Sequence, residues 1–143
     1  MATYFTLKEL CSSPTAKKQG IDNFPSFEIA DHLRDLTKKI LDPLREAWGG
    51  PIRVNSGYRC QALNSLVGGA RQSAHMTGYA ADLFPSNGMI ETFIRFTRKW
   101  LDDNNIPYDQ LIRETDHKTV WMHIGLYGPN GRQRRQYLDL VKK

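Results

Sequence analysis

The sequence lacks a long hydrophobic run. Uncharged apolar stretches in its 143 residues extend over only a few positions, whereas a membrane-spanning helix needs roughly 20. The first ten residues also lack a basic start followed by an apolar stretch, which is the pattern of a secretory signal. We therefore expect no membrane association, and a cytoplasmic location until another route releases the protein to its target.

Cysteine is scarce, and repeats and linkers are missing. Cys11 and Cys60 fit neither a C-x-x-C pair nor a disulfide scaffold, so we expect free thiols and no cysteine-based zinc site. Glycine and proline are scattered, with no low-complexity stretch. With 40% hydrophobic and 24% charged residues, the composition indicates one globular domain over residues 1–143, which we expect to be a monomer.

Acidic residues are few near the C-terminus, where most of the net charge of +5 lies. Residues 132–143 contain five basic residues and one acid, Asp139. We interpret this segment first as a solvated terminus, and second as a contact for a polyanion such as an acidic cell-envelope polymer. A nucleic-acid partner is disfavoured because no RRM, zinc-finger or basic-zipper pattern accompanies the charge.

One long helix is predicted between Phe24 and Gly49. Apolar residues recur there at steps of three and four, which places them on one helical face. Ser26 is a suitable N-cap, and Gly49 is a suitable C-terminal stop. Pro43 has no backbone N–H, so we expect the helix to bend or divide near Leu41-Asp42. His32, on the polar side of this helix, is expected at the surface.

The remaining pattern predicts a small sheet. Four strands are expected, at Pro51–Ser56, Ala80–Phe84, Asp109–Glu114 and Val120–Leu126. The last two are close enough to form a hairpin through residues 115–119. Further helices are expected at Cys60–Val67 and after Asn87-Gly88. The predicted fold class is α+β, a small and mainly antiparallel sheet flanked by helices.

Two histidines and an aspartate form a candidate metal site. His75 and Asp82 are seven residues apart, and a loop that enters a strand can bring both to one point. In the strand that contains His123, aliphatic residues alternate with it and belong on the core, so His123 faces a cleft. Two imidazoles and a carboxylate suit Zn²⁺ with a fourth position open for water, the arrangement of catalytic zinc sites. Other divalent ions are also accepted by such a set, and each residue taken alone is compatible with a structural role.

These residues lie within a series of motifs: S-G-Y-R at Ser56–Arg59, S-x-H-x-x-G-x-A-x-D from Ser73 to Asp82, and W-x-H ending at His123. The series resembles the zinc D-Ala-D-Ala carboxypeptidase family, whose fold is shared with the Hedgehog signalling domain and lysostaphin-type endopeptidases. Its small cell-wall branch, which includes phage L-alanyl-D-glutamate endopeptidase endolysins, is the most similar. The resemblance extends from Asp22 to about Leu126.

The resemblance implies roles for individual residues. It implies zinc ligation by His75, Asp82 and His123, and a catalytic role for Arg59 in holding substrate or stabilising oxyanion charge. The alternative for Arg59 is an ion pair that fixes its loop. Ser73 is expected to orient the loop of His75 by hydrogen bonding.

The general base is where the sequence departs from the family pattern. Many relatives carry an acid three residues before the last zinc-binding histidine, but Val120 occupies that position. Glu114, at the end of the preceding strand, is our candidate base, if the strand register places it on the same face as His123. Asp116 and His117 are the alternatives.

The expected function is therefore that of a zinc metallopeptidase acting on peptide bonds next to D-amino acids in peptidoglycan stem peptides. An endolysin-like endopeptidase is favoured over a D,D-carboxypeptidase, because the short chain leaves little length for insertions that would close a pocket. The alternative from another class is a non-catalytic member of the fold that binds wall peptide or protein, a reading that Val120 keeps open.

Overall fold

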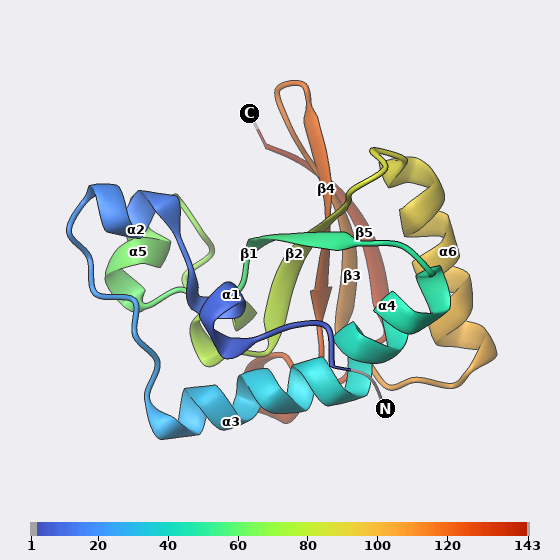
Figure 1. Cartoon of the computed structure of the whole chain (residues 1–143), viewed down its shortest axis with the longest axis horizontal. Helices are drawn as coiled ribbons and strands as arrows, with labels where there is room; N and C mark the ends of the chain where they lie inside the picture. The colour runs from blue at the N-terminus through green and yellow to red at the C-terminus, as the bar shows by residue number, and fades with distance from the viewer. Residues whose placement is uncertain (1–2, 143) are drawn as a thin grey trace.

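A computed structural model describes residues 3–142. Its elements, in chain order, are α1 (Leu7–Cys11), α2 (Pro14–Lys18), α3 (Phe27–Leu36), η1 (Thr37–Leu41), α4 (Asp42–Trp48), β1 (Ile52–Ser56), α5 (Gln61–Leu66), η2 (Ala74–Thr77), β2 (Ala80–Pro85), α6 (Ile90–Asp103), β3 (Gln110–Asp116), β4 (Thr119–Gly125), η3 (Pro129–Gly131) and β5 (Gln136–Lys142). Figure 1 shows helices around a single sheet, so the predicted α+β class is confirmed. Within the described range, no helix is both long and apolar enough to span a bilayer.

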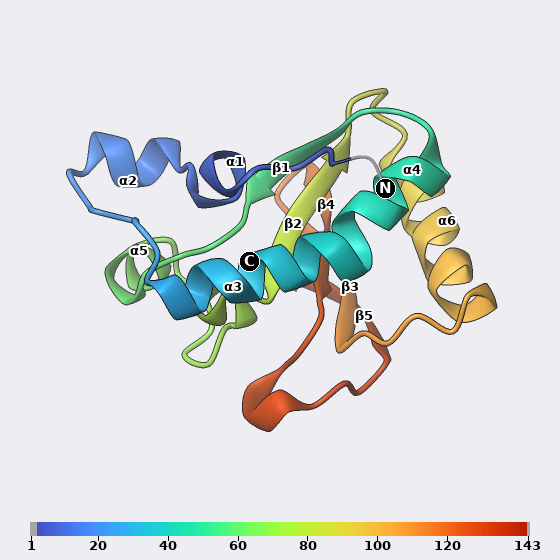
Figure 2. The same cartoon turned by 60° about the horizontal axis from the view of Figure 1, so that its bottom comes forward.

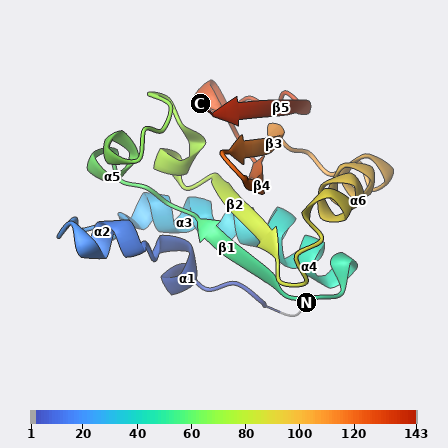
Figure 3. The same cartoon turned by 90° about the horizontal axis from the view of Figure 1, so that it is seen from above.

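The sheet has five strands in the order β1-β2-β4-β3-β5. Every neighbouring pair is antiparallel except β3 and β5, which are parallel. β3 and β4 form the predicted hairpin, and their pairing continues to Asp116 and Thr119, which leaves a turn of only His117 and Lys118. His117 has a positive φ of 54°, which a turn this tight requires. Figure 3 shows the strands side by side in this order.

The long predicted helix is confirmed, with a change of helix type before Pro43. Ser26 is its N-cap, accepting a hydrogen bond from the Ile29 amide, and Gly49 ends it in the left-handed conformation. η1 between α3 and α4 is π-helical, and the Asp42 amide bonds to the Thr37 carbonyl five residues back. The wider turn accommodates the missing proline N–H, so the helix continues without breaking.

The core lies between one face of the sheet and the helices. In Figure 2, α3, α4 and α6 lie against this face. Strand residues Leu83, Leu111, Met122 and Ile124 are fully buried there. The buried helix residues that meet them include Leu33, Leu36, Ile40, Leu44, Phe93 and Leu101. Because strand side chains alternate, the opposite face of β2, β3 and β4 is left for other groups.

The C-terminal segment is largely exposed, but it forms the edge strand β5, which the sequence analysis did not predict. β5 pairs along its whole length with β3, from Gln110 and Gln136 to Asp116 and Lys142. Two of the basic residues before it are ion-paired, Arg134 with Asp109 and Arg135 with Asp102. Less of the basic charge is therefore available to a polyanion than the sequence indicates.

Candidate metal centre

Asp82 and His123 are brought together by the strand register. Asp82 of β2 is the direct partner of His123 in β4, and His123 is the partner of Ile112 in β3. Directly opposed residues project from the same face of a sheet, so the two side chains lie on the face opposite the helical core. Asp82 is 3% exposed and His123 is 7% exposed, so both are shielded from bulk water.

His75 reaches this row from η2, the short helix that precedes β2. One donor atom from each of His75, Asp82 and His123 lies within 4.8 Å of the other two. His75 Nε2 lies 3.1 Å from Asp82 Oδ1, His123 Nδ1 lies 3.1 Å from the same oxygen, and the two nitrogens are 3.2 Å apart. The structure thus brings together all three residues that the sequence indicated as ligands.

The spacing of these atoms fits a zinc ion. Zn–N and Zn–O bonds of about 2.0–2.1 Å in tetrahedral geometry separate the ligand atoms by about 3.3 Å, close to the 3.1–3.2 Å observed. His75 Nδ1 lies 2.7 Å from the Gly57 carbonyl oxygen, to which it donates a hydrogen bond. This bond orients the ring so that Nε2 points to the cluster. Donor atoms that converge in this way provide a site for a cation.

The loop of His75 is fixed by short local bonds. The Ser73 hydroxyl accepts a hydrogen bond from the His75 amide at 3.1 Å, which confirms the orienting role predicted for Ser73. The His75 carbonyl accepts a hydrogen bond from the Arg59 amide at 3.0 Å. The S-G-Y-R segment and η2 are therefore held to one another on both sides of the imidazole.

Arg59 is placed beside Asp82, where it forms the ion pair that was the alternative reading of its role. Its Nη2 lies 3.2 Å from Asp82 Oδ2, so Asp82 offers Oδ1 to the cluster while Arg59 holds the other oxygen. Nε donates to the Ser56 hydroxyl and Nη1 to the Asn64 side-chain oxygen. Arg59 also lines the cleft described below, so it borders the space that a substrate would occupy.

Asp82 is kept ionised by its neighbours. Burial alone raises the pKa of this carboxyl, but the His75 and His123 rings more than offset that effect and hold the pKa far below its ordinary value. An anionic ligand between two imidazoles is the protonation state that metal binding requires.

A cleft of about 430 Å³ opens over this face of the sheet. Its floor includes His123 together with Ile112 and Glu114 of β3 and Leu138 of β5. The loop that contains Gly69 and Ser73 forms one wall. His75 and His123 therefore line an accessible cleft. Asp82, the strand partner of His123, lies directly beside them.

Glu114 lines this cleft, on the same face as His123. It is two residues beyond Ile112, the direct partner of His123, so the register meets the condition set for it as a general base. The alternatives Asp116 and His117 lie at the hairpin end of β3 and do not line the cleft. His117 is also the most exposed, with 86% of its side chain accessible.

Comparison with known families matches residues 3–119 to the family described as Peptidase M15. The chain belongs to the peptidase M15 family. The matched region contains Arg59, His75, Asp82 and Glu114 and ends before His123, which the strand register adds to the cluster. The family resemblance found in the motifs is thereby confirmed.

The chain is also similar to a curated relative, the zinc D-Ala-D-Ala carboxypeptidase of Streptomyces albus G. The two are 54% identical over 44 residues, which are 30% of this chain and 17% of the relative. The similarity is therefore local and covers a small part of the relative's length.

The sequence analysis missed two residues that line the cleft. Asp109, only 2% exposed, and Arg134 form an ion pair at one end of the cleft. Asp109 begins one of the predicted strands and could have been noticed there, but Arg134 was counted as terminal charge. Their pairing depends on a contact between distant parts of the chain that no local pattern encodes.

His32 is partly exposed at the surface, with 24% of its side chain accessible. It is not a free surface residue, because its ring stacks on Tyr79 with centroids 4.2 Å apart, and its Nδ1 lies 2.7 Å from the Thr77 carbonyl oxygen. His32 thus joins α3 to the end of η2, two residues beyond the ligand His75.

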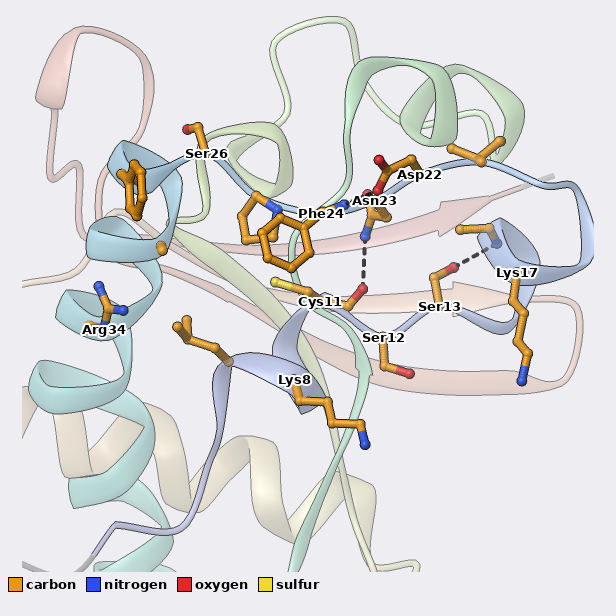
Figure 4. Close-up of a pocket in the computed structure, with 16 residues that line it drawn as sticks. Lys8, Cys11, Ser12, Ser13, Lys17, Asp22, Asn23, Phe24, Ser26 and Arg34 are labelled. Carbon is orange, nitrogen blue, oxygen red and sulfur yellow. Dashed lines mark hydrogen bonds between the residues drawn. The ribbon is translucent and has the colours of Figure 1, made fainter.

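A hollow larger than the cleft lies elsewhere, between α1, α2 and the start of α3 (Figure 4). Its volume is about 710 Å³, and Phe24 and Phe27 at its border are 84% and 94% exposed. The Asn23 side chain donates to the Cys11 carbonyl at its base. None of the three metal-ligand candidates lines it, so size alone does not mark the site of chemistry.

Proposed function

We propose that this M15 chain is a zinc metallopeptidase that hydrolyses a peptide bond next to a D-amino acid in peptidoglycan stem peptides. The observation that carries the proposal is the convergence of the His75, Asp82 and His123 donor atoms beside a cleft that His75, His123 and Glu114 line. In this proposal the protein acts on the cell wall after release from the cytoplasm.

Two residues that line the cleft, Glu114 and Arg59, have tasks in this reaction. A zinc ion held by His75, Asp82 and His123 would supply Lewis acidity toward the scissile carbonyl and the attacking water. Glu114 takes a proton from the attacking water and passes it to the amine that leaves. Arg59 holds Asp82 in place, and its guanidinium borders the cleft where negative charge develops on the carbonyl oxygen.

An endopeptidase is favoured by the extent of the cleft. It continues from the metal ligands across β3 to Leu138 and Leu140 on the edge strand β5, and in the other direction to the loop around Gly69. A peptide could therefore extend on both sides of the bond to be cut. A D,D-carboxypeptidase is the second candidate, because the chain is similar to a relative with that activity in its name.

The proposal is tested by measuring zinc content and peptide release from purified peptidoglycan on the same samples. We expect about one zinc per chain in the wild type. His123→Ala should lose the metal and the activity, because the cluster loses one of three ligands. Glu114→Gln should retain zinc while turnover falls by about 100-fold or more, as expected for removal of a general base. Glu9→Gln, an exposed glutamate on α1 outside the cleft, is the matched control.

Product analysis separates the remaining candidates. Release of free D-alanine from a stem pentapeptide would identify a carboxypeptidase, and internal fragments would identify an endopeptidase. If Glu114→Gln remains active, another group is the base. If the zinc-loaded wild type binds wall peptide and cuts none, the chain is a binding member of the family and the proposed hydrolysis is wrong.

A further inference from the structure

Arg134 is held rigidly at one end of the cleft by a buried carboxylate. Its Nε lies 2.8 Å from Asp109 Oδ1, its Nη2 lies 2.7 Å from Oδ2, and its backbone amide donates to Oδ1 at 3.1 Å. Asp109 is only 2% exposed, so the anion that fixes the guanidinium cannot swing into solvent. The two parallel bonds set the plane of the guanidinium as well as its position.

One edge of this guanidinium has no partner among the described residues. Asp109 occupies Nε and one N–H of Nη2, and among residues 3–142 no hydrogen bond to Nη1 is formed. The Arg134 side chain is 38% exposed and lines the cleft. Two parallel N–H groups on the free edge match the two oxygens of a carboxylate.

The other charged groups at the cleft do not offer this recognition. Each side-chain nitrogen of Arg59 already donates one hydrogen bond, to Ser56, Asn64 or Asp82, so it has no wholly unpaired nitrogen like Nη1 of Arg134. Glu114 is an acid and would repel a second carboxylate at short range. Arg134 is therefore the side chain of the cleft best suited to bind an anion beside the metal ligands.

Its position relative to the metal ligands suits a group next to the scissile bond. Arg134 is bound to Asp109, which lies three residues before Ile112 in the sequence. Ile112 is the direct partner of His123. Three residues of strand correspond to roughly 10 Å. Glu114 lies beyond Ile112 in the opposite direction along β3. A peptide bond at the metal ligands would therefore place a carboxylate one or two residues away within reach of Arg134.

We propose that Arg134 binds a free carboxylate of the substrate peptide and makes the enzyme selective for acidic stem peptides. This inference rests on the proposed function. A stem peptide can supply such a group in two ways, as the α-carboxylate of a D-glutamate linked through its side chain or as the carboxylate of its C-terminal residue. Both present the same two oxygens, and the experiment distinguishes them.

The test compares one stem peptide in three forms: both carboxylates free, the D-glutamate α-carboxylate replaced by a carboxamide, and the C-terminal carboxylate replaced by a carboxamide. Dissociation constants by calorimetry and kcat/KM are measured with the zinc-loaded wild type, Arg134→Gln and Arg134→Lys. We expect the wild type to prefer the free peptide over one of the two amides by about 10- to 100-fold, the range for hydrogen bonds between charged groups. That amide identifies the carboxylate that is bound.

Both variants should abolish this preference while still binding the amide peptide. Arg134→Lys keeps a positive charge beside Asp109 but has no second edge, so it tests recognition in a protein that retains its ion pair. Arg135→Gln is the matched control, because Arg135 bonds to Asp102 and the Ile106 carbonyl outside the cleft. It should keep the wild-type preference.

Three results would overturn the inference: equal affinity of the wild type for all three peptides, no binding of any of them, or an unchanged preference in the Arg134 variants. An equal loss for every peptide would likewise reduce Arg134 to a structural residue. Binding with a carboxylate preference that Arg134→Gln removes, but with no cleavage by any form, would contradict the proposed hydrolysis and support the inference.

Discussion

Gly57 connects the packing of α1 to the orientation of a metal ligand. Its carbonyl oxygen accepts the hydrogen bond from His75 Nδ1, and the backbone of Leu10 in α1 lies directly against its α-carbon. The next residue, Tyr58, donates its amide to the Leu10 carbonyl at 2.8 Å. A residue with no catalytic group therefore fixes the imidazole plane, as outer-shell partners of metal ligands do.

We expect Gly57→Ala to weaken both stability and zinc binding. The added methyl group would collide with the Leu10 backbone, which cannot move without displacing α1. We predict a loss of about 1–3 kcal/mol in the free energy of unfolding of the metal-free protein, and about a 10-fold or greater loss of zinc affinity. Denaturant unfolding and zinc titration measure the two effects. Gly50→Ala, where a methyl group meets only ordinary contact with Trp48, is the control and should change neither.

Individual site residues were predictable where the sequence places them near one another or on an alternating strand. His75 and Asp82 share one short segment, and the aliphatic neighbours of His123 fix which way it faces. Arg134 and Asp109 are 25 residues apart, and His32 and Thr77 are 45 apart. Those contacts arise only when the elements pack, so no local pattern indicates them.

At the scale of elements, local periodicity predicted α3, α4, α6 and four strands, and failed for β5. Leu138 and Leu140 have the spacing of a strand, but the surrounding basic residues made the segment resemble a solvated terminus. β5 pairs with β3 although β4 lies between them in the sequence, and composition does not encode such a non-local pairing. α1 and α2 were missed because each is only five residues long, too short for a periodic pattern.

Arg113 joins three elements through an ion-pair network. It bonds Glu91 of α6 with Nη2 at 2.7 Å and Asp139 of β5 with Nη1 at 3.3 Å. The hydrogen bond from Arg113 lowers the pKa of Glu91 below its ordinary value. The ionised carboxylate therefore stabilises the folded protein above the pKa that Glu91 has in the unfolded chain. That contribution disappears as the pH falls through the lowered folded value.

Glu91→Gln should accordingly destabilise the protein at pH 7 and make little difference in acid. The expected loss at pH 7 is at most about 1 kcal/mol, because the Glu91 side chain is 48% exposed and solvent screens the pair. Urea midpoints of the variant and wild type at pH 7 and pH 3 provide the measurement. Glu9→Gln, which removes a carboxylate without an ion pair in the described chain, should show no such pH dependence. A gap that widened in acid would contradict this account.

At the scale of the whole molecule, one ion would bond to two neighbouring strands and to η2. His75 and His123 are 48 residues apart, so a bound metal stabilises the folded chain and has no preformed site in the unfolded one. A chelator should therefore lower the melting temperature of the zinc-loaded protein. The loss is about 2.7 kcal/mol if free zinc had been 100 times its dissociation constant. Calorimetry with and without the chelator measures it, and His123→Ala should melt at the same temperature in both conditions.

The position of the metal ligands within the strand order affects which parts of the protein open first on heating. β2 and β4, which contain Asp82 and His123, lie inside the sheet, whereas β1 and β5 are its edges. Edge strands open in local fluctuations that cost less free energy than global unfolding, and their amide hydrogens exchange sooner. Leu138 and Leu140, at the far end of the cleft, belong to such an edge. We therefore expect warming to weaken peptide binding before the metal ion is released.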